Sequence, residues 1–187
     1  MKNGVRVWLY QLMAVIASFM MFYSFSLPWW GTDSFIITRA MQFIFPPDSI
    51  KIYAYGLEHN FGTETYDITE YIWDDETPPY QTKLAWAYLG VSIVAIIASS
   101  FIKKKWGQYL LGFVGLTYIA YALVAMFVVI GGRLNELGIA LQGWSSYIGS
   151  ASMHTSIRTG WYLAIASGSV LFTLAVARSY FFKQKEQ

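Results

Sequence analysis

Four apolar stretches constrain this chain more than any other feature, because each is long enough to cross a lipid bilayer. A spanning helix needs about 20 mostly apolar residues, and a helix satisfies its own backbone hydrogen bonds where no water is present. The stretches hold no charged residue except Arg178, in the last turn of the fourth. We therefore predict an all-α membrane protein, a four-transmembrane-helix antiparallel bundle in a single membrane domain over residues 1–187. The predicted spans are Val7–Leu27, Leu84–Ile102, Tyr109–Ile130 and Trp161–Phe182.

The Lys and Arg residues between the spans are distributed unevenly, and this predicts the orientation of the chain. Eight of them, against the single acid Glu186, lie on the side that holds both termini and the short turn between the second and third spans. The opposite side carries ten acids and five basic residues. Basic residues accumulate in cytoplasmic segments, so we expect a multi-pass protein of the cell membrane with both termini cytoplasmic. The eight basic residues are Lys2, Arg6, Lys103, Lys104, Lys105, Arg178, Lys183 and Lys185.

The first outer segment, residues 28–83, contains the pattern of a small β-hairpin. Ile50–Tyr55 alternates apolar and polar side chains, and Thr63–Trp73 is rich in β-branched and aromatic residues. Alternation at a period of two is typical of a half-buried strand. We therefore predict an extracytoplasmic β-hairpin cap formed by these two strands, with the turn at Glu58–Gly62. Upstream, Ser34–Phe45 is predicted to be an amphipathic or interfacial stretch.

The second outer segment, residues 131–160, carries weaker signals. Arg133–Gln142 has Leu residues on one helical face and is expected to extend the third span by one or two turns. Gly143–Thr159 is rich in Ser and Gly and also holds Trp144 and Tyr147. We expect this stretch to pack on another part of the chain or on a partner.

The spans contain no ionisable side chain that would build a pathway through the bundle. Buried charged or His residues usually mark pumps, transporters and channels, and broken helices mark many transporters. We therefore expect no buried charge in the bundle and no transport function. Close helix approach is predicted at four small residues, Gly112, Gly115, Ala164 and Gly168.

Histidine and carboxylate side chains in the outer segments are the candidates for a metal site. The chain has no Cys, which excludes disulfides and thiolate-bound metals. Imidazole and carboxylate suit copper, zinc or iron, and the candidate ligands are His59, His154 and Asp67. No close H-x-x-H or E-x-x-H spacing supports them, and two lone loop histidines are usually just part of a polar surface. We expect no cofactor.

Aromatic and charged residues outside the spans are candidates for contacts with partners and lipid. The acidic run that ends at Glu76 lacks the spacing of a calcium loop and is interpreted as a solvated rim that docks a basic partner. The three lysines between the second and third spans are expected to attract anionic lipid headgroups. The predicted contacts are Trp29, Trp30, Asp74, Asp75, Glu76, Trp144 and Tyr147 for a partner, and Lys103, Lys104 and Lys105 for headgroups.

The order of these parts resembles the layout of claudin-like tetraspan proteins over the whole chain. Those proteins have cytoplasmic termini, a long first outer loop with a small sheet, a very short inner turn and a shorter second outer loop. Trp29 and Trp30 lie near the start of the claudin signature, whereas its Gly-Leu-Trp and two Cys are missing here. The stretches Leu27–Trp30 and Tyr53–Leu57 are also similar to small prokaryotic four-span membrane proteins of unassigned role. The resemblance implies a four-span fold and a role in adhesion or self-assembly.

No catalytic signature accompanies the spans, and we expect the protein not to be an enzyme. The first hypothesis is a non-catalytic accessory or structural subunit of a larger integral-membrane complex, of the respiratory or monooxygenase type. Its partners would be the lipid bilayer and other integral-membrane subunits, and no nucleic acid. The first alternative is a claudin-like adhesion or self-assembly protein that binds copies of itself. The second is an extracytoplasmic metal-site protein or enzyme.

Overall fold

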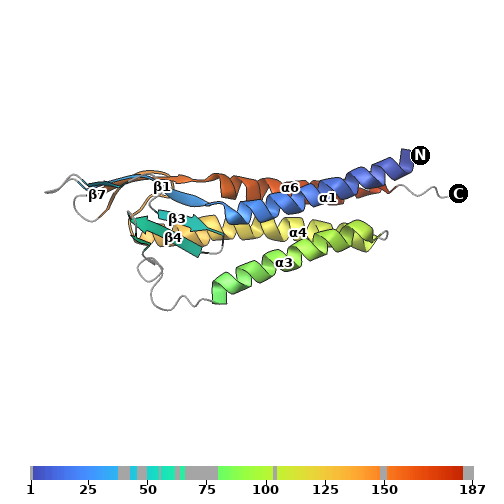
Figure 1. The fold of residues 1–187 in the computed structure, drawn as a ribbon, viewed down its shortest axis with the longest axis horizontal. Helices are drawn as coiled ribbons and strands as arrows, with labels where there is room; N and C mark the ends of the chain where they lie inside the picture. Colours follow the sequence, from blue (N-terminus) through green and yellow to red (C-terminus); the bar gives the residue numbers. More distant parts are fainter. Residues whose placement is uncertain are drawn as a thin grey trace.

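The chain is elongated, with a helix bundle, a β-sheet extending from one end of it, and both termini at the other end (Figure 1). We call these the sheet end and the termini end. The computed structural model describes residues 2–37, 43–45, 50–54, 56–61, 64–65, 80–102, 105–147 and 151–182. Helices and strands of the described chain therefore occupy separate regions.

Four long helices confirm the four predicted apolar spans. Each is long and apolar enough to cross a membrane, as expected of a multi-pass membrane protein. The third continues past its predicted span, as expected for the segment after residue 130, because a π-helical stretch joins it directly to a further α-helix that ends at Glu136. The helices are α1 (Lys2–Ser26), α3 (Tyr80–Phe101), α4 (Lys105–Leu123), η1 (Val124–Ile130), α5 (Gly131–Glu136) and α6 (Thr159–Phe181).

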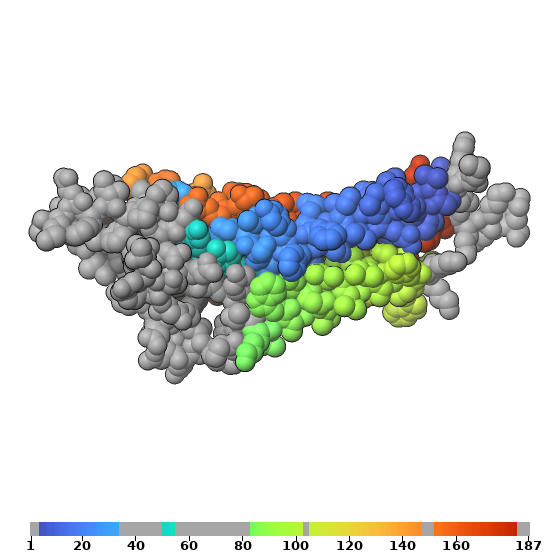
Figure 2. Space-filling view, in the orientation of Figure 1, coloured from blue at the N-terminus to red at the C-terminus, as the bar shows by residue number. Residues whose placement is uncertain are grey.

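The helices are apolar on their outer surfaces as well as in their core. Large side chains such as Phe19, Val91 and Val128 are more than half exposed, whereas Tyr118 and Leu111 are fully buried. A helix that is apolar all round is typical of a membrane span, because lipid rather than water covers the outward face. Figure 2 shows the side of the molecule on which α1 and α3 lie next to each other.

Helices α4 and α6 approach most closely at two of the predicted small residues. A Cβ atom on Gly115 would lie 2.8 Å from the carbonyl oxygen of Gly168, and one on Gly168 would lie 2.7 Å from Ile119 Cγ1. Both contacts are shorter than a real Cβ tolerates, so glycine is required on both helices. Ala164 is buried on the same helix as Gly168, while Gly112 has room for a Cβ in ordinary contact with Ala175.

The chain is mostly helical, as predicted, and its cap is a larger sheet than the predicted hairpin. Seven antiparallel strands form it, in the order β5-β4-β3-β1-β7-β6, with β2 paired to β1 outside this path. The strands come from both outer segments and therefore join them into one structure. They are β1 (Trp30–Ile37), β2 (Phe43–Phe45), β3 (Ile50–Tyr53), β4 (Gly56–Phe61), β5 (Glu64–Thr65), β6 (Gly143–Tyr147) and β7 (Ala151–Ile157).

The sheet differs from the predicted hairpin in its pairing and in its extent. The partner of β3 is β4, which covers most of the predicted Glu58–Gly62 turn, with Tyr53 opposite Gly56. The predicted interfacial stretch 34–45 instead contributes β1 and β2, whose register pairs Phe35 with Phe45. The Ser- and Gly-rich stretch 143–159 forms β6 and β7. Its short polar residues hid a strand pattern that depends on pairing with β1 rather than on local propensity.

Strands β1 and β7 continue almost directly into helices α1 and α6. The Arg158 N–H donates to the Trp29 carbonyl oxygen at 2.7 Å, and the Gly160 N–H donates to that of Pro28 at 3.0 Å. A Cβ on Gly160 would lie 2.5 Å from the Leu27 carbonyl oxygen. The two chain segments therefore run antiparallel from sheet to bundle without a loop between them. Main-chain hydrogen bonds join sheet and bundle at this point.

Candidate functional site

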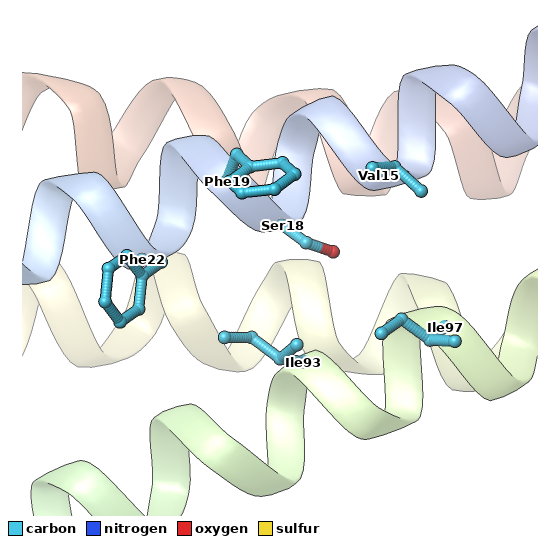
Figure 3. Close-up of a pocket in the computed structure, with 6 residues that line it drawn as sticks. All are labelled: Val15, Ser18, Phe19, Phe22, Ile93 and Ile97. Carbon is cyan, nitrogen blue, oxygen red and sulfur yellow. The ribbon is translucent and has the colours of Figure 1, made fainter.

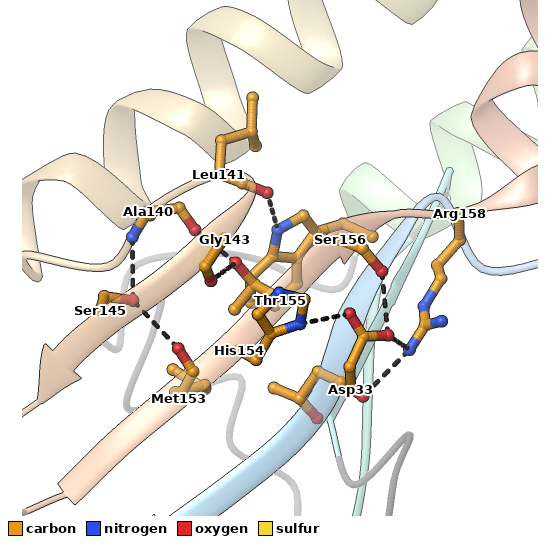
Figure 4. A network of polar contacts seen from close by, with 12 residues as sticks. Asp33, Ala140, Leu141, Gly143, Ser145, Met153, His154, Thr155, Ser156 and Arg158 are labelled. Atoms are coloured by element: carbon orange, nitrogen blue, oxygen red, sulfur yellow. Dashed lines mark hydrogen bonds and ion pairs between the residues drawn. The ribbon is translucent and has the colours of Figure 1, made fainter.

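A β-bulge places the most polar cluster of the described residues on the sheet. The register of β1 against β7 pairs Thr32 with Thr155 and Ser34 with His154, which leaves Asp33 as an extra residue. A bulge redirects the side chain at the inserted residue. The Asp33 carboxylate is thereby turned toward side chains of β7 and of the link to α6 (Figure 4).

Three side chains bind the Asp33 carboxylate. Its Oδ2 lies 2.7 Å from His154 Nδ1, and its Oδ1 lies 2.7 Å from Arg158 Nη2. The Ser156 hydroxyl donates to the same Oδ1 at 3.0 Å. Arg158 also donates to the Thr32 carbonyl oxygen at 3.0 Å. The cluster therefore joins β1, β7 and the start of α6, with about a third of the Asp33 and His154 side chains exposed.

Strand β6 and the loop before it cover one side of this cluster. The Trp144 ring packs against the His154 ring with centroids 5.1 Å apart. Thr155 donates its hydroxyl to the Ala140 carbonyl oxygen at 2.7 Å, and Trp30 Nε1 donates to that of Leu141 at 2.8 Å. The position of β6 is therefore coupled to the polar cluster through His154 and to the core of the sheet through Trp30.

The two histidines of the predicted metal site lie on different strands. His154 is on β7 and the backbone of His59 is on β4, and β1 and β3 lie between these strands in the sheet. Three strand spacings amount to roughly 14 Å. The side chain of His59 and all of Asp67 lie outside the described residues. Asp33 and Ser156 are instead the residues beside His154, and no histidine spacing in the sequence pointed to them.

The predicted partner residues fall into three groups. Trp144 is 59% exposed on β6, the outermost strand on that side of the described sheet. Trp29 and Trp30 are fully buried within the chain, so their prediction as partner contacts is corrected. Asp74, Asp75, Glu76, Lys103, Lys104 and the Tyr147 side chain lie outside the described residues.

Trp29 belongs to an aromatic cluster between the bundle and the sheet. Its Nε1 donates to the Ser24 carbonyl oxygen at 2.9 Å, and its ring lies 5.8 Å from that of Tyr121. The Tyr121 hydroxyl donates to the Ala54 carbonyl oxygen, which follows β3. Tyr118 lies deeper in the bundle, with its hydroxyl 2.6 Å from Ser24 Oγ. These rings connect helix packing to the position of the sheet.

A buried arginine at the termini end corrects the expectation of a bundle without buried charge. Arg178 on α6 is 3% exposed. Its Nη1 donates to the Tyr10 hydroxyl at 2.7 Å and to the Ser99 carbonyl oxygen at 3.0 Å, and its Nη2 donates to the Ile102 carbonyl oxygen. The guanidinium also lies 4.5 Å from the Phe182 ring centroid. One side chain therefore joins α1, α3 and α6.

A long basic side chain in the last turn of a spanning helix commonly extends to water. The structure shows the opposite because the end of α3 supplies carbonyl oxygens that have no partner within their own helix. A Cβ on Gly107 of α4 would lie 2.8 Å from Arg178 Nη2. Glycine at that position therefore makes room for the guanidinium, a relation that no local sequence pattern reveals.

No protein-family model matches the chain, and no curated protein is similar to it in sequence. The four apolar helices are consistent with a tetraspan protein and point to no specific family.

Proposed function

We propose that this protein is a structural subunit of a larger integral-membrane complex and that it docks through strand β6. The observation that carries the proposal is the exposure of Trp144 on β6 at the side of the described sheet. Exposed aromatic residues are enriched at the centres of protein interfaces. A partner that covers Trp144 would gain most of its binding energy from this one ring.

The sequence of β6 supports strand-edge docking. Among the described strands β6 pairs only with β7, so one edge has backbone groups available to an added strand. Its sequence, Gly-Trp-Ser-Ser-Tyr, contains no charge and no Pro. Proteins normally place such residues, or bulges, on open edges to prevent pairing. An uncharged edge is therefore suited to a contact that is meant to form.

The polar cluster supports the same role because it fixes the position of β6. The Asp33 carboxylate binds His154, and the His154 ring packs on Trp144. Docking onto a strand that is already positioned costs less conformational entropy than docking onto a mobile one. In this proposal His154 and Asp33 are positioning residues for the docking surface.

Purification from the native membrane in mild detergent, with mass spectrometry of the proteins that co-migrate, tests the proposal. We expect foreign membrane subunits in fixed stoichiometry, lost in Trp144→Ala and Trp144→Lys variants. Trp106→Ala is the matched control, since Trp106 is an exposed tryptophan at the other end of the bundle. Equal retention of the partner by the Trp144 and Trp106 variants would contradict docking through β6.

The same experiment separates the two alternatives. An assembly containing only multiples of the 21.3 kDa chain would favour self-assembly, for which an uncharged edge strand suits antiparallel pairing of β6 with its copy. A metal ion that co-purifies, and an activity that His59→Ala with His154→Ala abolishes while the assembly stays whole, would favour the metal-site alternative. The structural proposal predicts that this double variant still retains the partner, with weaker binding than wild type because His154 no longer packs on Trp144, and with a smaller loss than in Trp144→Ala.

A further inference from the structure

The elements on either side of β6 fix its direction relative to the bundle. Helix α5 ends at Glu136, β6 follows at Gly143–Tyr147, and β7 (Ala151–Ile157) returns to the start of α6 at Thr159. In Figure 1, β1 and β7 extend from the ends of α1 and α6 along the long axis of the molecule. Strand β7 therefore runs toward the bundle, and its antiparallel neighbour β6 runs away from it.

The surface of the bundle indicates how this long axis lies relative to a membrane. A cavity of about 320 Å³ lies between α1 and α3, and among the described residues that line it only Ser18 has a polar side chain (Figure 3). The Ser18 hydroxyl donates to the Ala14 carbonyl oxygen within α1. A bundle that is apolar on its outer surface is suited to lipid on every side, so its long axis crosses the bilayer. The strands continue this axis outward, and β6 runs away from the membrane.

We propose that the partner of β6 is an uncharged strand that runs toward the same membrane and leads into a transmembrane helix of a different chain. This rests on the proposed function, because a strand must first dock at β6. Every strand pair described in the sheet is antiparallel, and antiparallel pairing is the more stable kind per residue. A strand added to β6 in the same way descends toward the bilayer, as β7 does before α6.

The β6 strand of a second copy in the same membrane does not meet this condition. Copies in one membrane share one orientation, so β6 of a neighbouring copy also runs away from the bilayer and is parallel to the first. Antiparallel pairing of two β6 strands needs a two-fold axis perpendicular to the strands, which inverts one bundle relative to the other. Such a pair forms only between opposing membranes, or in detergent, where the bundles are free to turn.

The other free strand edges of a second copy are too short to cover β6. Among the described strands that run toward the bundle, only β2 and β5 have an edge without a partner strand. They contain three and two residues, against five in β6. Main-chain hydrogen bonds supply the affinity of an added strand, and a copy would leave part of β6 unpaired. A strand of matching length therefore comes from a different chain.

The side chains of β6 favour an uncharged partner strand with an apolar residue opposite Trp144. Strand β6 itself carries no charge. The Asp33 carboxylate nearby is already bound by Arg158 and His154, so it is not available to a cation on the partner. A charged residue opposite Trp144 would lose its hydration without gaining an ion pair.

Photo-cross-linking from single cysteines tests the direction and the origin of the added strand, because the chain contains no cysteine of its own. Gln142→Cys and Ser146→Cys place thiols at two exposed positions, before β6 and within it, about 13 Å apart along an extended chain. Each thiol in the native membrane is coupled to a maleimide–diazirine reagent. After illumination the full chain is purified, and the linked residues are mapped by mass spectrometry.

We expect both variants to link to one foreign membrane protein. Because the strands are antiparallel, the residue linked to position 146 should precede the residue linked to position 142 in the partner sequence. A transmembrane span of the partner should begin within about ten residues after the second of these. Trp106→Cys is the matched control, since Trp106 is exposed at the other end of the bundle and should give no link to the same strand. Adding Trp144→Ala to Ser146→Cys should lower the cross-linking yield about tenfold.

Three results would overturn the proposal. The opposite order of the two linked residues would show that the added strand is parallel to β6. Links between copies of this chain would identify a second copy as the occupant, in an opposing membrane where both linked residues lie in β6. Links to a protein without a transmembrane span would show that the strand does not lead into the membrane. The absence of any link from either position would contradict docking through β6 itself, so failure of the proposed function is distinguishable from failure of this inference.

Discussion

The two ends of the bundle are stabilised by different means. At the sheet end, α1 and α6 continue into paired strands, and main-chain hydrogen bonds such as that from Gly160 to Pro28 join them. At the termini end, side chains make the connection: Arg178 binds Tyr10 and the last carbonyl groups of α3, and the Tyr10 ring packs on those of Phe181 and Phe182. The first connection is made by the backbone, whereas the second is made by side chains, with Arg178 as the one that reaches all three of α1, α3 and α6.

The two arginines show how the surroundings decide the partner of a guanidinium. Arg158 is a quarter exposed and pairs with the Asp33 carboxylate. Arg178 is buried among helices, and the partners found for it among the described residues are carbonyl oxygens, a hydroxyl and aromatic rings. A carboxylate would add a second desolvation penalty in that position. The negative end of the α3 dipole supplies part of the compensation instead.

Replacing Arg178 with Met should have the largest effect on the stability of the bundle. The Ser99 and Ile102 carbonyl oxygens would lose their donors, at a cost of about 1–3 kcal/mol for each group left unsatisfied. Unfolding by dodecyl sulfate in mixed micelles, followed by tryptophan fluorescence, measures the change. The stability of Arg178→Lys should lie between that of Arg178→Met and that of wild type, because an ammonium group retains the charge but lacks the planar arrangement of guanidinium donors. A variant with Met that is more stable than wild type would show that desolvation of the guanidinium outweighs its hydrogen bonds.

Gly160→Ala should have the next largest effect, because it tests the main-chain connection at the sheet end. The added Cβ would lie 2.5 Å and 2.6 Å from the Leu27 and Pro28 carbonyl oxygens, which forces the two segments apart. Overpacking of this kind costs about 1–3 kcal/mol. Gly90→Ala is the control, since a Cβ there has open space within helix α3. If both variants had wild-type stability in the same dodecyl sulfate titration, the junction would not be rigid.

The helical half of the structure was largely predictable from the sequence, whereas the sheet was not. A run of about 20 apolar residues has one stable conformation in lipid, so composition alone predicts α1, α3, α4 and α6. Strands depend on their neighbours. Gly143–Tyr147 has weak strand propensity, and it forms β6 because Ala151–Ile157 is held against β1 and offers an edge to pair with.

The candidate site residues divide in the same way. Trp144 could be proposed from its type and its place outside the spans, and it is exposed. Trp29 and Trp30 looked equally suitable, yet their rings fill the junction between bundle and sheet. Asp33 was missed because its role arises from a bulge, which is a property of the register between β1 and β7. Local sequence does not encode that register.

Asp33→Asn should reduce stability less than Arg178→Met or Gly160→Ala, and the size of the reduction should depend on the salt concentration. The substitution removes the ion pair with Arg158 while it keeps an oxygen for Ser156. Partly exposed ion pairs contribute up to about 1 kcal/mol, and salt screens them. We therefore expect the difference in the free energy of unfolding between this variant and wild type to shrink when the titration is repeated in about 0.5 M salt. The Debye length there is roughly 4 Å. The difference for Arg178→Met should stay constant, because salt does not reach a buried group. An equal response of both variants to salt would remove the distinction between the two arginines.

Tyr88→Phe should have the smallest effect and shows how firmly α3 is held at the sheet end. The Tyr88 hydroxyl donates to Thr117 Oγ1 of α4 at 3.1 Å, and that oxygen in turn donates to the Val114 carbonyl oxygen of its own helix at 3.1 Å. Removing the tyrosine hydroxyl therefore leaves no buried donor without a partner. Hydrogen bonds between membrane helices contribute about 0.6 kcal/mol on average, and we expect a loss of that size in the dodecyl sulfate titration. Thr117→Val is the change on the other helix and should give a larger loss, because it leaves the Tyr88 hydroxyl without its acceptor; adding Tyr88→Phe to it should recover part of that loss. A larger loss for Tyr88→Phe, near that of Arg178→Met, would mean that α3 is anchored by side-chain hydrogen bonds at both ends, and the contrast between the two ends would not apply to this helix.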